Sequence, residues 1–253
     1  NIIESMNRSP ESTVADVLPD IVREWVKQQL QSGELSRYTI KKCVASCKSL
    51  FSSWARDYYG RIGLKVPAKL DFVSVKTPVA QYSLPVQDVR DKVVEYIKLQ
   101  WQEHTPISFV LVLAYFAGMS RADIVRAEWS WVRDGHVYYS RHKTGRRADP
   151  PLPEFVADWF GSADALALSA ERQFIIPGDT EDARYRVCEQ AGKELRSIGW
   201  GDRLVLHELR KLACSQWATR CGLQWAARWI GDSEATAASY YRDLLPEEAP
   251  KAW

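Results

Sequence analysis

Four short patterns in the sequence contain side chains that bind oxyanions, move protons or act as nucleophiles. In chain order they are Gly118-Met119-Ser120-Arg121-Ala122-Asp123-Ile124, Lys143-Thr144-Gly145, His207-Glu208-Leu209-Arg210, and Ile230-Gly231-Asp232-Ser233 followed by Tyr240-Tyr241. Arginine binds oxyanions with a planar fork of donors, histidine transfers protons near neutral pH, and tyrosine attacks when its proton is drawn off. Singly, an HxxR pattern is typical of a helix-surface pair and KTG of a turn. The informative feature is their order.

Together, in this order and spacing, the four patterns resemble the catalytic domain of the tyrosine site-specific recombinases, the phage integrase family. The helical region from Thr13 to Tyr58 resembles that family's core-binding domain, so the resemblance covers nearly the whole chain. It implies a DNA recombinase or integrase that breaks and rejoins double-stranded DNA through a 3′-phosphotyrosyl intermediate. It also implies self-association as a tetramer on DNA, with no cofactor, metal, membrane or small-molecule substrate.

The resemblance assigns roles to three of these side chains. Arg210 would hold the phosphate, and His207 would hydrogen-bond it and help relay the proton of the nucleophile. Lys143, at the tip of a hairpin, would act as general acid, because a departing 5′ alkoxide needs a proton.

The nucleophile is expected to be Tyr241. It stands ten residues after Gly231, which is the spacing that the family motif implies, whereas its neighbour Tyr240 stands nine residues after it. A free tyrosine has a pKa of about 10, so attack at neutral pH requires neighbours that draw off the proton.

The sequence departs from the family pattern at two positions. Ser120 occupies the place of the first catalytic arginine, and Arg121, one residue later, is the expected substitute beside Asp123, which matches the family's acidic position. Asp232 stands where the family has histidine, or less often tryptophan or lysine. An ionised carboxylate there repels a phosphate unless it is paired or turned away.

Two alternatives stand beside an active recombinase. One is a catalytically weakened, integrase-like DNA-binding protein. The other is a type IB topoisomerase, which shares the chemistry, although the short chain and the motif spacing favour a recombinase.

The expected fold is mainly α-helical, with two domains. Residues 1–78 would form a small all-α core-binding domain with its linker, and residues 79–253 a larger helical catalytic domain with a small antiparallel β-sheet. Capping and periodicity predict one helix over Val14–Leu30, kinked at Pro19, and a second over Thr39–Tyr58, with Trp54 and Tyr58 on its buried face. The stretch from Arg61 to Tyr82 has no periodicity and reads as an extended linker, which would let the domains close around DNA.

The second helix carries a candidate DNA-binding face at Lys41, Lys48 and Arg56. Such a face is also typical of a plain solvated surface, and the pattern does not separate the two. Residues 1–76 hold 12 Lys and Arg against 8 Asp and Glu, so the excess positive charge lies at the N-terminal end.

In the second domain, proline, glycine and periodicity predict further elements. Helices are expected over residues 83–100 and 106–118, from Pro153, near Asp182, at His207 and beyond Gln224. Turns at Asp134-Gly135 and residues 143–146 would flank a strand over Val137–Arg141.

Composition excludes several classes of protein. The chain is 46% hydrophobic and 26% charged and has no apolar run long enough for a membrane span. The start at Asn1 lacks a signal-peptide core, so a cytoplasmic location is expected. Five cysteines without a CxxC pair predict reduced core residues rather than disulfides or zinc ligands.

Overall fold

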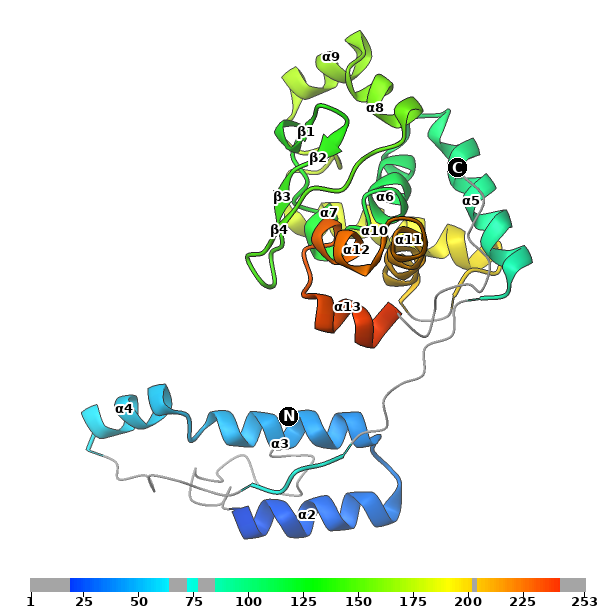
Figure 1. The fold of residues 1–253 in the computed structure, drawn as a ribbon. Coiled ribbons are helices and arrows are strands. Elements are labelled where there is room, and N and C mark those ends of the chain that lie inside the picture. Colours follow the sequence, from blue (N-terminus) through cyan, green and yellow to red (C-terminus); the bar gives the residue numbers. More distant parts are fainter. Residues whose placement is uncertain (1–18, 64–71, 77–84, 202–203, 242–253) are drawn as a thin grey trace. The chain divides into compact units, whose positions relative to one another are not determined.

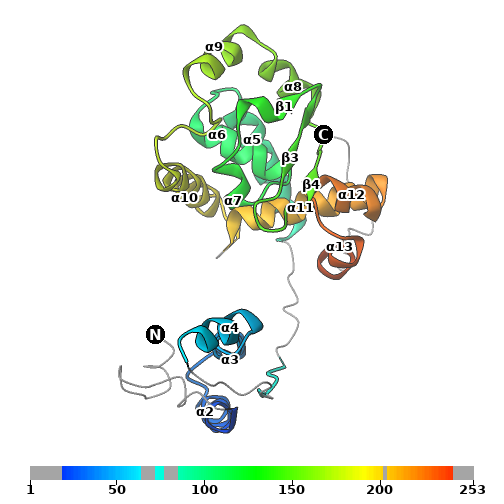
Figure 2. The same cartoon turned by 90° about the vertical axis from the view of Figure 1, so that its left-hand side faces the viewer.

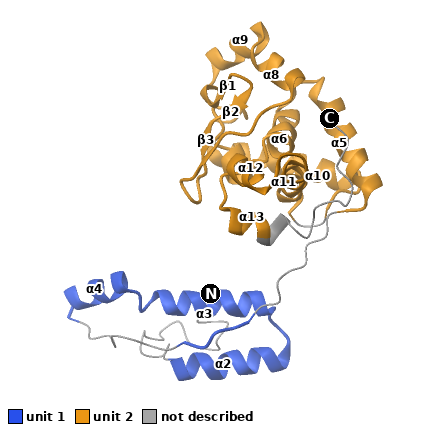
Figure 3. Cartoon of the chain, in the orientation of Figure 1, with its two compact units in different colours: residues 1–81 blue, residues 82–253 orange. Residues whose placement is uncertain are grey.

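The computed structural model describes residues 19–63, 72–76, 85–201 and 204–241, and the side chains of residues 239–241 are outside the description. The chain divides into two compact units, residues 1–81 and 82–253, coloured separately in Figure 3. None of the helices in the described ranges has the length and apolar character needed to cross a membrane. All five cysteines are free thiols.

Unit 1 contains three described helices, α2 (Pro19–Ser32), α3 (Arg37–Ser49) and α4 (Ser53–Arg61), shown in Figure 1. Its core is formed by buried apolar side chains, among them Val22, Trp25, Ile40, Val44 and Phe51. Helix α2 begins at Pro19, and the kink predicted there stays a prediction. Proline suits the first helical position, where its missing N–H has no intrahelical partner. Residues 14–18 of the predicted helix lie outside the described residues.

The predicted helix over residues 39–58 is wrong as a single element, since the structure has two helices separated by residues 50–52. The side chain of Ser52 accepts a hydrogen bond from the backbone N–H of Ala55 at 3.3 Å and so caps the start of α4. The break changes the helical register. Trp54 and Tyr58 are therefore 76% and 51% exposed rather than buried.

Part of the predicted linker packs on unit 1. Val75 is buried in the core of this unit, and the ring of Phe72 lies 5.6 Å from that of Phe51, centroid to centroid. Residues 72–76 thus belong structurally to unit 1. At its start, Arg61 ends α4 and Ile62 follows as the helix cap. Residues 64–71 and 77–82 of the predicted linker lie outside the described residues.

Unit 2 is a helical assembly around α6 and α11 (Figures 1 and 2). Its helices are α5 (Gln87–Trp101), α6 (Pro106–Tyr115), α7 (Arg121–Ile124), α8 (Glu154–Phe160), α9 (Ala163–Glu171), α10 (Glu181–Ser197), α11 (Val205–Cys221), α12 (Leu223–Trp229) and α13 (Glu234–Tyr241). Helix α6 is apolar on all sides and packs against α5, α10 and α11. It begins at Pro106. The side-chain oxygen of the preceding Thr105 accepts a hydrogen bond from the backbone N–H of Ser108 at 3.2 Å and so caps the helix.

The described residues of unit 2 also form two small antiparallel sheets. Strands β1 (Val132–Arg133) and β2 (His136–Val137) pair with Val132 opposite Val137, and β3 (Tyr139–Ser140) and β4 (Arg147–Ala148) pair with Tyr139 opposite Ala148. The strand predicted over residues 137–141 is thus divided between two sheets, because the N–H of Tyr138 bonds to the carbonyl of Trp131 at 2.8 Å instead. Strand β4 lies against α12 (Figure 2). The predicted fold class, mainly helical with small antiparallel sheets, is confirmed.

Candidate phosphate-binding site

Helix α11 fixes one arginine in the interior of unit 2. The side chain of Arg210 is 1% exposed, and its guanidinium donates to the carbonyl oxygens of Gly118 and Ile230, the latter at 2.9 Å. It also donates to Oδ2 of Asp232 at 3.2 Å. A buried guanidinium needs such acceptors to offset its desolvation. Arg210 therefore joins three segments: the loop before α7, the end of α12 and the turn before α13.

Asp232 is paired with a second arginine. Arg141, directly after β3, donates through Nη1 to Oδ1 of Asp232 and to the carbonyl oxygen of Gly231 at 3.3 Å. The carboxylate is thus shared by two guanidiniums, and its negative charge is compensated. Sequence reasoning missed Arg141. The available signal was its place on the hairpin two residues before Lys143.

His207 lies on the first turn of α11 in a positively charged surrounding. Partial burial of the ring, followed by the positive charges of Lys211, Arg210 and Arg141, lowers the pKa of His207 to about 4, against the opposite effect of Asp232. By its solvent-accessible surface the residue as a whole is exposed. His207 is therefore neutral at pH 7 and able to accept a proton.

Asp123 connects α7 to the hairpin. Its carboxylate accepts a hydrogen bond from the hydroxyl of Ser120 at 2.6 Å and from the backbone N–H of His142 at 2.8 Å. The side chain is buried, so these bonds fix the base of the hairpin that carries Arg141. Ser120 acts here as a partner of Asp123.

Arg121 is not brought to this site. Its side chain is exposed, and its guanidinium carbon lies 5.1 Å from the ring centroid of Tyr185 on α10. The charges that influence His207 come from Arg210, Arg141, Lys211 and Asp232. The expectation that Arg121 replaces the missing arginine is therefore corrected: a one-residue shift along α7 turns the side chain by about 100°, toward α10.

The other expected catalytic residues are placed as follows. Lys143 is exposed in the turn between β3 and β4, where Gly145 has a φ of 66° and its N–H bonds to the carbonyl of Arg141 at 2.8 Å. Tyr241 is the last residue of α13, the helix that begins two residues after Asp232. Its side chain lies outside the described residues.

The candidate DNA-binding residues of unit 1 are divided between two helices. Lys41 and Lys48 are exposed on α3, seven residues apart and so on one face, whereas Arg56 is half-buried on α4. The predicted face is therefore not one continuous helix surface.

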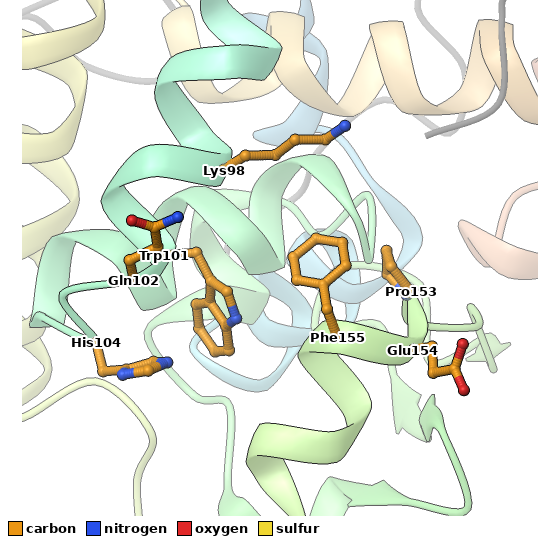
Figure 4. A pocket seen from close by; sticks show the side chains of 7 residues that line it. All are labelled: Lys98, Trp101, Gln102, His104, Pro153, Glu154 and Phe155. Atoms are coloured by element: carbon orange, nitrogen blue, oxygen red, sulfur yellow. The ribbon is translucent and has the colours of Figure 1, made fainter.

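A pocket of about 950 Å³ is lined by residues of α5, α8 and their adjoining loops (Figure 4). It is lined by Lys98, Trp101, Gln102, His104, Pro153, Glu154 and Phe155. It contains none of the residues around Arg210, and we assign no reaction to it. No group of three or more His, Cys, Asp and Glu side chains within the described ranges could hold a metal ion.

Both the sequence and the fold have counterparts among known proteins. No protein-family model matches the sequence. The integrase of Escherichia phage HK022 is 28% identical over 148 residues, which are 55% of this chain and 42% of that protein. The match thus spans less than half the length of this relative.

Two solved structures illustrate the shared fold. A lambda integrase tetramer bound to a Holliday junction has a TM-score of 0.65 and 17% identity, covering 99% of this chain and 72% of that one. The XerH site-specific recombinase bound to difH substrate has a TM-score of 0.57 and 14% identity, covering 90% and 68%. The chain therefore shares the fold of these recombinases, and part of its sequence is similar to a phage integrase.

Proposed function

We propose that this protein breaks and rejoins duplex DNA through a covalent 3′-phosphotyrosyl link to Tyr241. The observation that carries the proposal is the pairing of Arg210 and Arg141 with Asp232, two residues before the helix that ends at Tyr241, with His207 near enough for these charges to shift its pKa. These are the charges and proton acceptor that phosphoryl transfer requires.

Each side chain has one task in the proposed reaction. The Tyr241 oxygen attacks the phosphorus, its proton passes to neutral His207, and the bond from phosphorus to the 5′ oxygen breaks. Lys143 donates a proton to that departing oxygen. Arg210 stabilises the charge on the non-bridging oxygens. Attack by the 5′ hydroxyl of another strand then reverses these steps and releases Tyr241.

Double-stranded DNA is the proposed partner, with a tetramer as the acting assembly. This is supported by the fold shared with a lambda integrase tetramer on a Holliday junction and with XerH on its difH substrate. The domain roles follow the same proposal: residues 1–78 bind DNA as a core-binding domain with its linker, residues 79–253 carry the chemistry, and the two close around the duplex. The reaction would take place in the cytoplasm.

A second candidate function is DNA binding with weakened catalysis. It is favoured by the placement of Ser120 and Arg121: the first is bonded to Asp123, and the second lies over Tyr185. Loss of one preorganised donor typically lowers a rate by about 10²- to 10³-fold. A weakened enzyme would therefore still form a measurable adduct.

Capture of the covalent intermediate tests the proposed function. The full chain is incubated with a pool of nicked duplexes of randomised sequence, so that a released fragment prevents rejoining, and the adduct is identified by mass spectrometry after nuclease digestion. We expect a nucleotide attached to Tyr241, lost in Tyr241→Phe and kept in the matched control Tyr240→Phe. DNA binding without any adduct would support the second candidate, and an adduct at Tyr240 would move the nucleophile by one residue.

A further inference from the structure

Two guanidiniums reach one carboxylate from different parts of unit 2. Arg141 extends from the end of β3 and Arg210 from α11, and each bonds to a different oxygen of Asp232. The side chains of Arg141, Arg210 and Asp232 are 11%, 1% and 16% exposed. Coulomb interactions are strong in such a partly water-excluded position.

The cluster carries more positive charge than its carboxylate compensates. Arg141, Arg210 and Asp232 together carry one net positive charge, and His207 beside them is neutral at pH 7. The buried carboxylate of Asp123 is also near both arginines, but its hydrogen bonds come from Ser120 and the N–H of His142. The Nε–H of Arg141 is buried and finds no hydrogen-bond acceptor among the described residues. A buried donor without an acceptor is costly. Charge and donor together indicate a place for a further anion.

The backbone of the turn before α13 makes room for Arg141. A Cβ atom at Gly231 would stand 2.8 Å from Cδ of Arg141, a distance that real Cβ atoms essentially never show, and 3.0 Å from Cγ, which is tighter than most real Cβ contacts. Gly231 also has a φ of 63°, in the left-handed region that favours glycine. The approach of Arg141 to Asp232 therefore depends on glycine at this position.

We propose that Arg141 is a phosphate-binding arginine of this site, beside Arg210, and that Asp232 is a built-in anion that holds both guanidiniums in place and competes with the phosphate for them. A phosphodiester resembles the Asp232 carboxylate in carrying one negative charge spread over two oxygens. Arginine forks bind both groups in the same way. Only the identification of the phosphate with the DNA backbone rests on the proposed function.

Competition between Asp232 and phosphate gives opposite expectations for two variants. Arg141→Ala removes a charged donor and weakens phosphate binding, about tenfold or more. Asp232→Asn keeps the shape of the side chain but removes its charge, and therefore strengthens phosphate binding. Arg121→Ala is the matched control, because Arg121 lies against Tyr185, and it should leave the affinity within about twofold.

The probe is inorganic phosphate, titrated into the full chain and followed through the Nε–H resonances of its arginines. The resonance of Arg141, assigned by its absence in Arg141→Lys, is expected to shift on titration and to report site binding separately from phosphate on surface lysines. Circular dichroism checks that each variant is folded. Arg141→Lys keeps the charge but loses the fork of donors, so it should bind phosphate with intermediate affinity. This variant replaces Arg141→Ala in the comparison if Arg141→Ala does not fold.

An unshifted Arg141 resonance, wild-type affinity in folded Arg141→Ala, or weaker binding in Asp232→Asn would each overturn the proposal. These results are independent of strand transfer. Phosphate binding as expected without a Tyr241 adduct would reject the proposed function and keep the anion site. A Tyr241 adduct formed by a chain whose phosphate affinity does not depend on Arg141 would reject the anion site alone.

Discussion

At the residue scale, Asp232 illustrates how a negatively charged side chain is accommodated beside Arg210, the proposed phosphate-binding arginine. Its carboxylate lies between Arg141 and Arg210, which compensate the charge, and Arg210 is held further by the carbonyls of Gly118 and Ile230. An unpaired carboxylate there would repel phosphate. Because it is paired with both arginines, the Asp232 carboxylate instead helps to hold their guanidiniums in place.

The same charges determine the protonation of His207. Its pKa is lowered from 6.5 to about 4 by partial burial and by Lys211, Arg210 and Arg141, whereas Asp232 raises it. We expect Arg141→Ala to raise this pKa, because a positive charge is removed, and Asp232→Asn to lower it further. An NMR titration of the histidine ring protons between pH 3 and 8 measures both shifts.

The lowered pKa of His207 also makes the stability of the folded chain depend on pH. An unfolded histidine takes up its proton near pH 6.5, whereas folded His207 does so only near pH 4. Between these pH values the unfolded state therefore binds more protons than the folded state. The contribution of His207 to the free energy of unfolding is thus fully present above pH 6.5 and is lost as the pH falls toward 4. A His207 that titrates near 6.5 in the folded wild-type chain would contradict this description of the site.

At the scale of elements, the site depends on the turns that end and begin helices. In unit 2, the turn between α12 and α13 brings Asp232 to Arg210. In unit 1, the break between α3 and α4 places Arg56 on a different helix from Lys41. An added Cβ at Gly231, in the turn between α12 and α13, would come too close to the Arg141 side chain. An added Cβ at Gly199, after α10, would have nothing within 4 Å.

These two glycines allow a matched test of the turn. Gly231→Ala and Gly199→Ala both place a Cβ at positive φ, 63° and 88°, and each should lower the free energy of unfolding by about 1–2 kcal/mol in urea denaturation. Gly231→Ala should in addition weaken phosphate binding, because Arg141 must shift. Equal phosphate affinities in the two variants would show that Arg141 adapts without losing its position.

At the scale of the whole molecule, each unit has its own apolar core. The catalytic candidates described by the structure all lie in unit 2, whereas the excess positive charge of the sequence lies in residues 1–76. We therefore expect unit 1 to supply much of the sequence-independent affinity for DNA, through cations that displace condensed counterions from phosphates.

Charge reversal on α3 tests this expectation. Lys41→Glu/Lys48→Glu should weaken binding to duplex DNA and reduce the slope of log affinity against log salt by about 1.8, the value for two phosphate contacts. The matched control is Arg23→Glu/Lys27→Glu, which reverses two exposed charges on α2. Arg56→Glu is measured separately because Arg56 lies on α4. If both double variants weaken binding equally, the α3 face contributes only through net charge.

The sequence by itself determined the features that depend on local pattern. Apolar periodicity and proline positions predicted α6, and the HxxR pattern placed His207 and Arg210 on one helix, because residues three apart share a helix face. The order of the motifs predicted the fold shared with integrases, and the turn at Lys143-Thr144-Gly145 followed from the preference of glycine for positive φ.

Only the tertiary structure decided which charged groups meet. Arg141 and Asp232 are 91 residues apart in the sequence, and no local pattern relates them. Arg121 was expected at the site from its place beside Asp123, but its side chain turns to Tyr185, because the direction of a side chain on a short helix depends on how that helix packs. The break at Ser52 was missed because helical spacing continues across it, while the hydrogen bond that begins α4 does not follow from apolar periodicity.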